Sequence, residues 1–318
     1  MSDTGSVFVF APAPFVSVTV EQLDGEPDIH FHAGGQGFWV ARMIASLEVP
    51  TTLCGSFGGE TGQVAKTLIE FENVQLRAVH VAAPNPAHLY DRRSGERETI
   101  VKMTSRPLSR HEVDELYSAA IGTALGADVC VLAGSLTPGI VPPEFYRRLA
   151  GDLQANERTV IADLSGEPLH AALDGGLDVL KIAHDELQEE GLASSDSVED
   201  LVKGAKELQN RGAAHIVVSR ADQPALALIG DEPLEICPPR LEPMDPHGAG
   251  DSMTAGIAAA LARRQDMRAA LRLGAAAGAL NVTRRGLGTG PGPEIERMTD
   301  EVSLRELDGS QATSGGER

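Results

Sequence analysis

Short β-rich runs that alternate with longer helix-patterned segments are the feature of this sequence that most constrains its fold. The clearest runs are Asp128–Ala133, Thr159–Asp163, Asp178–Ile182 and His215–Ser219, and a helical stretch follows each of them. This order is typical of βαβ units around a largely parallel sheet. The sequence therefore predicts a doubly wound α/β core, with ligand sites at the carboxyl ends of its strands.

Two stretches interrupt the alternation and predict hairpins instead. The paired runs are Phe15–Val20 with Asp28–His32, and His88–Asp91 with Arg97–Lys102. We expect these lid strands, about residues 13–33 and 86–104, to form a small antiparallel sheet that projects from the core. Such a sheet can cover a site or pair with a second copy of the chain.

Chain length and composition favour one folded unit. A chain of 318 residues with 42% hydrophobic content can bury one large core. We expect residues 1–305 to form a single domain, with the lid strands inserted in the core. The small polar residues of the stretch 306–318 predict a flexible tail.

Net charge and hydrophobic patterning exclude several classes of partner. The formal charge of −19 and the lack of a Lys/Arg cluster argue against nucleic acid. No apolar run approaches the roughly 20 residues that a membrane span requires, and the N-terminus lacks the basic start of a signal peptide. Three widely spaced cysteines, without a metal-ligand pattern, indicate buried free thiols. We therefore expect a cytoplasmic protein that acts on a small molecule.

The run Gly248-Ala249-Gly250-Asp251 closely precedes an alanine-rich helical segment from Met253 to Leu261. Backbone N–H groups at a helix start have no partner within the helix, and they bind anions. Asp251 is then expected beside the anion, where a carboxylate can take a proton from a hydroxyl that attacks a phosphoryl group. Ordinary helix capping is the alternative for so short a string. Its position after the alternating sheet favours a phosphate site.

Other candidate segments lie at turns or predicted strand ends. The glycine cluster Gly34–Gly37 leads into a helix and either lets backbone approach a ligand or only forms a tight turn. Ser135 follows a core strand and is expected to face the crevice. Glu186 opens the helix after the strand of Lys181, where it either binds a hydrated Mg²⁺ or is solvated. The basic loop 284–290 is either a ligand contact or a surface loop.

Several motifs, taken in order, resemble those of the PfkB (ribokinase-like) carbohydrate kinase family, in the branch of 1-phosphofructokinase and tagatose-6-phosphate kinase. They are Gly34–Ala41, Gly58–Gly62, Leu132–Gly139, Asp163–Leu169 and Gly248–Ser252. The resemblance spans nearly the whole chain and implies a ribokinase-like core with a β lid. It implies ATP-dependent phosphoryl transfer to a hydroxyl of a sugar or sugar phosphate. It also implies Mg²⁺, allows a monovalent cation, and implies a homodimer through the lid.

The resemblance also implies roles for particular residues. Asp251 is the implied general base, and the anion hole is formed by Gly248, Ala249 and Gly250. The implied metal ligand is Glu186. The implied nucleotide contacts are Lys181, Ser219, Ala221, Pro224, Gly248, Gly250, Ala277 and Asn281. The implied substrate contacts are Phe15, Gly35, Gln36, Trp39, Tyr90, Arg92 and Ser135.

This sequence departs from the family pattern at several positions. Phe15 stands where the family often has the acid of Asn-Pro-Ala-x-Asp, and Gln36 and Trp39 replace the Lys and Asn of the glycine turn. Ala183–Glu186 replaces Asn-x-x-Glu, and Ala221–Pro224 replaces the usual Gly-x-x-Gly. These changes predict a divergent substrate pocket. A catalytically weak, pseudokinase-like ligand-binding or regulatory protein on the same fold is the alternative hypothesis.

Overall fold

A central sheet organises the computed structural model of the chain, which describes residues 5–95, 97–245, 247–284 and 286–307. Its strands within these residues are β1 (Val7–Phe10), β4 (Thr51–Phe57), β5 (Gln75–His80), β8 (Val129–Ala133), β9 (Thr159–Asp163), β10 (Leu177–Ala183), β11 (Ala213–Arg220), β12 (Gln223–Ile229), β13 (Glu232–Cys237) and β14 (Ser303–Glu306). In space they follow the order β14-β13-β12-β11-β10-β9-β8-β1-β4-β5. Neighbours from β5 to β11 are parallel, and those from β11 to β14 are antiparallel. The predicted mostly parallel sheet is confirmed.

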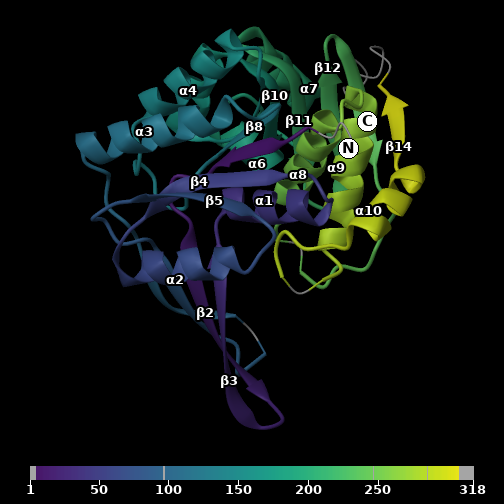
Figure 1. Ribbon diagram of the computed structural model, residues 1–318. Coiled ribbons are helices and arrows are strands. Elements are labelled where there is room, and N and C mark those ends of the chain that lie inside the picture. The colour runs from purple at the N-terminus through teal and green to yellow at the C-terminus, as the bar shows by residue number, and fades with distance from the viewer. Residues whose placement is uncertain (1–4, 96, 246, 285, 308–318) are drawn as a thin grey trace.

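Helices cover both faces of this sheet (Figure 1). They are α1 (Gln36–Ser46), α2 (Gly59–Glu70), α3 (Arg110–Ala124), α4 (Pro143–Ala155), α5 (Gly166–Gly175), α6 (His184–Glu189), α7 (Val198–Asn210), α8 (Ala249–Ala262), α9 (Met267–Asn281) and α10 (Gly292–Met298). Strand side chains alternate between two cores because successive residues point to opposite faces. Val7 and Val9 pack with α1, α8 and α9, whereas Phe8 and Phe10 pack with α3 and α4. The core is therefore doubly wound.

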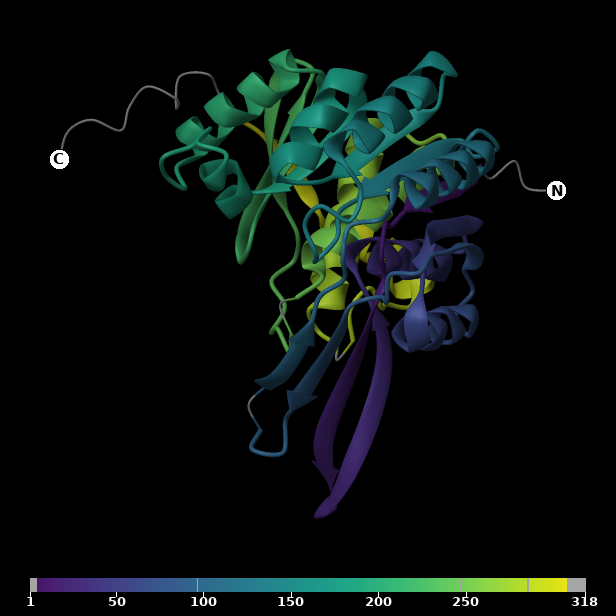
Figure 2. The same cartoon turned by 90° about the vertical axis from the view of Figure 1, so that its left-hand side faces the viewer.

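The lid is a separate four-stranded sheet that extends away from the core (Figure 2). Its two antiparallel hairpins are β2 (Phe15–Leu23) with β3 (Glu26–Gly34), and β6 (Ala87–Asp91) with β7 (Glu98–Met103). A parallel pairing of β2 with β6 joins the hairpins. Both hairpins lie where the sequence predicts them.

The two faces of the lid differ in chemistry. In register across one face stand Val18, Phe31, Leu89 and Val101, and across the other stand Ser17, His32, His88 and Lys102. Helix α2 packs against β2 and β3, and Val18 joins the buried core there. Farther from the core the same face is open, since Phe31 is 54% exposed and Val101 51%. An apolar surface on the lid thus remains uncovered.

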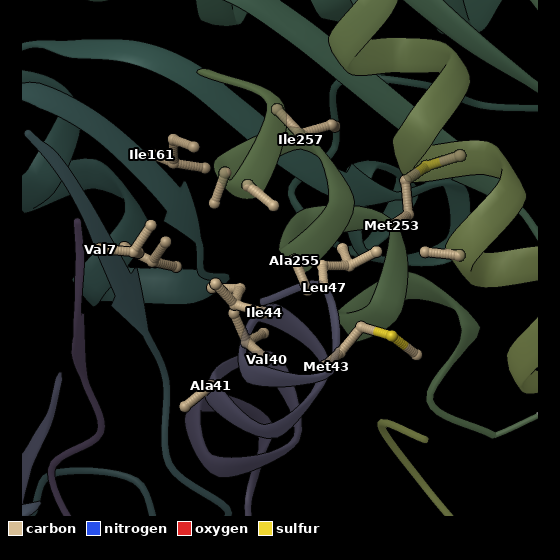
Figure 3. Close-up of a cluster of buried hydrophobic side chains, with 14 of the residues drawn as sticks. Val7, Val40, Ala41, Met43, Ile44, Leu47, Ile161, Met253, Ala255 and Ile257 are labelled. Carbon is tan, nitrogen blue, oxygen red and sulfur yellow. The ribbon is translucent and has the colours of Figure 1, made fainter. Parts of the chain in front are cut away.

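Helices α8 and α9 pack more closely than ordinary side chains allow. A Cβ atom on Gly256 of α8 would lie 2.6 Å from the Cα of Gly274 in α9, so the two backbones touch. Helix α8 also contributes Met253, Ala255 and Ile257 to the buried cluster that α1 completes (Figure 3). These contacts fix the position of the first turn of α8.

Several elements differ from the sequence-based expectation. The four predicted core strands are β8 to β11, but β1, β4, β5 and β12 to β14 were not identified from the sequence. The expected tail begins too early, because Glu306 ends β14 and the N–H of Leu307 donates to the carbonyl of Pro233 over 3.0 Å. The rest of that tail, 308–318, lies outside the described residues. Among the described residues, every helix is too short or too polar to span a bilayer.

Candidate active site

The first turn of α8 forms an open cradle of backbone N–H groups. Gly248 precedes the helix in a left-handed conformation, with φ 76° and ψ 4°, which glycine adopts readily. A Cβ atom at this position would also lie 3.3 Å from the Cβ of Leu287 and 3.4 Å from the Nδ2 of Asn281. No side chain within the described residues caps this helix start. Its N–H groups are therefore available to an anion.

Lys181 lies against this cradle from the end of β10. A Cβ atom on Gly250 would come within 2.7 Å of the Lys181 Nζ, and the Oγ of Ser219 is 4.0 Å from the same point. Only a glycine at position 250 leaves room for the lysine. The fold therefore brings together three predicted nucleotide contacts from α8, β10 and β11.

Asp163, at the end of β9, ties these elements together. Its Oδ1 lies 3.2 Å from the Lys181 Nζ, and its Oδ2 accepts a 2.7 Å hydrogen bond from the Thr254 hydroxyl. The side chains of Asp163 and Lys181 are only 1% and 7% exposed. The Thr254 hydroxyl also donates to the Gly250 carbonyl over 3.2 Å, so the network holds the first turn of α8, which carries the predicted base. Sequence reasoning assigned no role to Asp163 or Thr254, although an acid that ends a buried strand was a usable signal.

The electrostatic environment of Asp251 suits proton transfer near neutral pH. Burial raises the pKa of the Asp251 carboxyl to about 7, the charge of Asp163 adds to this effect, Lys181 opposes it, and Glu186 adds to it. Burial acts to lower the pKa of Lys181, but the neighbouring Asp163, Asp251 and Glu186 outweigh it and the pKa is raised. The raised pKa of Lys181 favours its charged form, and the raised pKa of Asp251 brings the gain and loss of its proton closer to neutral pH.

Glu186 lies in the first turn of α6, beside this network. Its Oε2 accepts a 2.8 Å hydrogen bond from the Ala183 N–H, and burial raises the pKa of its carboxyl. Within the described residues no cluster of three His, Cys, Asp or Glu side chains is arranged to hold a metal. Mg²⁺, however, commonly takes one or two carboxylates together with waters and phosphates. Glu186, Asp163 and Asp251 repel one another electrostatically, and a bound cation would lower this repulsion. These residues therefore fit Mg²⁺.

The remaining predicted nucleotide residues lie on two turns and on α9. Asn281 is 1% exposed; its Nδ2 donates to the His247 carbonyl over 2.8 Å, and its Oδ1 accepts from the Gly288 N–H over 2.9 Å. It therefore binds the loop before the cradle to the loop 286–290. Ala277 is fully buried in α9, whereas Ala221 is exposed in a left-handed turn with φ 49°, and Pro224 lies just after that turn as the second residue of β12.

The predicted substrate residues at the lid base form an aromatic cluster. The ring of Phe15 meets Trp39 edge-on, with centroids 5.9 Å apart, and lies 4.9 Å from the ring of His88. The His88 Nδ1 is 2.9 Å from the Tyr90 hydroxyl. Phe15 is 4% exposed and lies over Gly34, where a Cβ atom would be 2.5 Å from the ring. The cluster joins the lid to α1.

The other predicted substrate residues are divided between the core and the lid. The Oε1 of Gln36 accepts a 2.9 Å hydrogen bond from the Gly134 N–H, so it links the glycine turn at Gly35 to the loop of Ser135. The Ser135 hydroxyl accepts from the Thr137 N–H over 3.3 Å. Arg92 lies 3.8 Å from Glu21 on the lid. A hollow of about 200 Å³ between α1 and residues 288–290 includes none of the predicted site residues.

A doubly wound sheet, a projecting lid and an acid behind a helix-start cradle together define the class of ribokinase-like small-molecule kinases. The model of the pfkB family carbohydrate kinases matches residues 11–294. The chain therefore belongs to the pfkB family of carbohydrate kinases, and it is an ATP-dependent enzyme of that kind.

Individual relatives agree with this assignment. The chain is 28% identical over 276 residues to the 1-phosphofructokinase of Bacillus subtilis, covering 87% of this chain and 89% of the relative. It is 32% identical over 260 residues to the ATP-dependent 6-phosphofructokinase isozyme 2 of Escherichia coli, covering 80% and 83%. The crystal structure of Escherichia coli phosphofructokinase-2 in complex with potassium aligns with a TM-score of 0.83 at 28% identity, covering 93% of this chain and 98% of that one.

Proposed function

We propose that the enzyme transfers a phosphoryl group from ATP to a hydroxyl of a sugar or sugar phosphate, with Asp251 as general base. The observation that carries this proposal is the Asp251 carboxyl, whose pKa is raised to about 7, directly behind the open N–H groups at Gly248 to Gly250. A base with a pKa near the working pH combines availability with driving force. The acid and the anion site stand in one helical turn.

In the proposed mechanism the protein positions and neutralises rather than forming covalent bonds. The N–H groups at Gly248, Ala249 and Gly250 receive charge that develops on the transferred group, and the Lys181 ammonium contacts the phosphates. Glu186 is the proposed carboxylate for a hydrated Mg²⁺, which would supply charge neutralisation at the phosphates when bound. Asp251 accepts the proton of the attacking hydroxyl.

The nucleotide is proposed to extend from this cradle along the ends of β10 and β11. Ser219 and the turn of Ala221 to Pro224 border one side, and Ala277 and Asn281 of α9 support the other. Asn281 is proposed to act by holding its two loops, since both ends of its amide are already hydrogen-bonded. A monovalent cation stays a prediction, because the carbonyls of His247, Leu287 and Gly286 near this loop already accept hydrogen bonds.

The acceptor is proposed to lie between the lid and the core. Its class follows the names of the relatives, which are kinases of phosphorylated fructose. Lys102 and Arg92 on the lid can complement an anionic group within an otherwise acidic protein. Phe15 and Trp39 replace polar contacts by ring faces, which suit the C–H side of a sugar. Gly35, Gln36, Tyr90 and Ser135 complete the proposed wall of the pocket.

We propose that residues 1–305, extended by Glu306 and Leu307, form a single domain. The lid of this domain is proposed to pair with the lid of a second copy of the chain. Phe31 and Val101 leave an apolar surface on the open part of the lid face that also carries Val18. Exposed apolar surfaces of this kind mark contact sites. A relative, Escherichia coli phosphofructokinase-2, has a structure described as a tetrameric inhibited form. Phe31→Glu should convert the proposed dimer to a monomer in light scattering, and an unchanged mass would exclude this contact.

The buried thiols of Cys54 and Cys130 support a reducing, cytoplasmic setting.

A coupled ADP-release assay tests the activity. Mg·ATP is supplied with fructose 1-phosphate, fructose 6-phosphate, tagatose 6-phosphate or unphosphorylated sugars, and turnover with at least one acceptor is expected. Thermal shift with Mg·ATP is the parallel measurement, since 100-fold excess over Kd stabilises by about 2.7 kcal/mol. If the chain shows no turnover and no thermal shift, these results favour the pseudokinase-like alternative.

A further inference from the structure

Arg220 is a buried cation at the end of β11 for which the proposed chemistry has no direct use. It is 8% exposed, and it follows Ser219 at the edge of the proposed nucleotide site. Among the described residues no carboxylate lies within 4.0 Å of its guanidinium as an ion pair, and its Nε has no partner. A buried charge without a counter-ion is costly. Its contacts show what it holds in place.

Within the described residues, the hydrogen bonds of the Arg220 side chain go to neutral oxygens at the start of β12 and on the loop between α6 and α7. Its Nη1 donates to the carbonyl of Pro224 over 3.3 Å, and its Nη2 donates to the Oε1 of Gln223. The same Nη2 donates to the carbonyl of Asp196 over 3.0 Å, in the loop between α6 and α7. The fork of the guanidinium therefore fastens the turn 221–224 to the loop that ends near α7.

The turn 221–224 needs such support because of its own sequence. Ala221 adopts φ 49°, a left-handed conformation that a residue with a Cβ disfavours by roughly 1 kcal/mol. The register of β11 against β12 also shifts between Val218 and Arg220. A glycine would adopt this turn without strain. Here a side chain holds a shape that the backbone does not favour by itself.

Asp196 connects this turn to the proposed metal side. Its Oδ1 accepts a 2.5 Å hydrogen bond from the Gln188 Nε2 and lies 3.8 Å from the His184 Nε2. Gln188 and His184 both belong to α6, the helix that carries Glu186 in its first turn. Through Asp196, Arg220 thus joins the nucleotide-side turn to the helix of the proposed magnesium ligand.

We propose that Arg220 is a positioning residue for the nucleoside triphosphate: it holds the turn 221–224 and α6 in one fixed arrangement around the end of β11. This inference rests on the proposed function, because it assumes that Mg·ATP binds beside Ser219. Arg220 acts through the turn and contacts no reacting atom. Its loss weakens nucleotide binding without changing the acceptor site.

Calorimetric titration of the full chain with Mg·ATP tests this role. Arg220→Met keeps the stem but removes three hydrogen bonds, and the Kd for Mg·ATP should rise about tenfold, a change of about 1.4 kcal/mol. Arg220→Lys keeps the charge but lacks the planar fork, so it should recover only part of the affinity. The matched control is Arg211→Met, an exposed arginine whose partner is His170. It should bind as the wild type does.

Kinetics distinguishes positioning from general damage to the fold. In Arg220→Met the KM for ATP should rise, while the acceptor KM and kcat at saturating ATP stay close to the wild-type values. A folded Arg220→Met that binds Mg·ATP with unchanged affinity overturns the inference and leaves the proposed function intact. A wild-type chain that binds no Mg·ATP overturns both. If Arg220→Met does not fold, Gln223→Ala removes one of the bonds, and unchanged affinity in that variant also overturns the inference.

Discussion

The catalytic cradle and the base of the lid are built in opposite ways. Around Asp251, charged groups are buried and joined by directed hydrogen bonds, which Lys181 and Thr254 both donate to Asp163. Around Phe15, aromatic rings meet at 4.9 to 5.9 Å with one hydrogen bond between His88 and Tyr90. Hydrogen-bonded geometry leaves little freedom, whereas ring contacts tolerate changes of shape. Under the proposed function, the reaction takes place in the first region and the acceptor is selected in the second.

Asp251→Asn provides the strongest test of the first region. An amide cannot accept the proton, so kcat should fall on the order of 10³-fold. The folded protein disfavours the ionised carboxylate, so this variant should be more stable than the wild type at pH 8, with the gap shrinking as pH falls through 7 towards 4. Thermal melts across this pH range and the coupled assay measure both effects. Asp231→Asn, at an exposed turn, is the control, and retained turnover in Asp251→Asn would refute the assigned base.

Gly250→Ala tests whether the cradle and Lys181 must touch. The added methyl would lie 2.7 Å from the Lys181 Nζ and 3.0 Å from its Cε, so the lysine must move. A misplaced charge at the phosphates should lower kcat/KM for ATP by roughly 100-fold. Gly122→Ala, on α3 with open space around the new methyl, is the matched control. Equal activity in both variants would break the picture of a rigid cradle.

Phe15→Leu tests the second region. Loss of ring contacts at a 4% exposed position should lower the free energy of unfolding by about 1 to 2 kcal/mol. The acceptor KM should rise about tenfold, while the KM for ATP stays the same. Phe71→Leu, at a residue that is 83% exposed, controls for the substitution itself. A change confined to the KM for ATP would reverse the division between the two regions.

The pH profile sharpens the comparison with the smallest expected effect. In the wild type, kcat/KM should fall as pH drops below about 7, because Asp251 becomes protonated. Asp163→Asn removes a negative neighbour that raises the pKa of Asp251, so the acid limb should move to lower pH. The control substitution in the lid, His88→Gln, should leave the acid limb of the profile at the same pH. If the acid limb does not move in Asp163→Asn, it reports the titration of a group other than Asp251.

The proposed catalytic turn is easier to predict from the sequence than the residues that support it. Gly248 to Asp251 could be located because a glycine turn, an acid and a helix start are contiguous, and backbone geometry follows from them locally. Asp163, Thr254 and Arg220 lie far apart in the chain, and only the strand order brings their partners to them. Strand β1 was missed because it has only four residues and no helical stretch follows it directly, and β4 because Thr51, Thr52, Gly55 and Ser56 interrupt its apolar run. The divergence at Phe15 was visible, but its packing over Gly34 required the structure.

The contact between Gly256 and Gly274 has a consequence for how substitutions accumulate in this chain. With no side chains between the two backbones, neither helix can slide or rotate to absorb a larger neighbour. The cradle on α8 and the amide of Asn281 at the end of α9 therefore move as a single body. Substitutions that alter the choice of acceptor are therefore better tolerated in the lid than in these two helices, which have to be redesigned together.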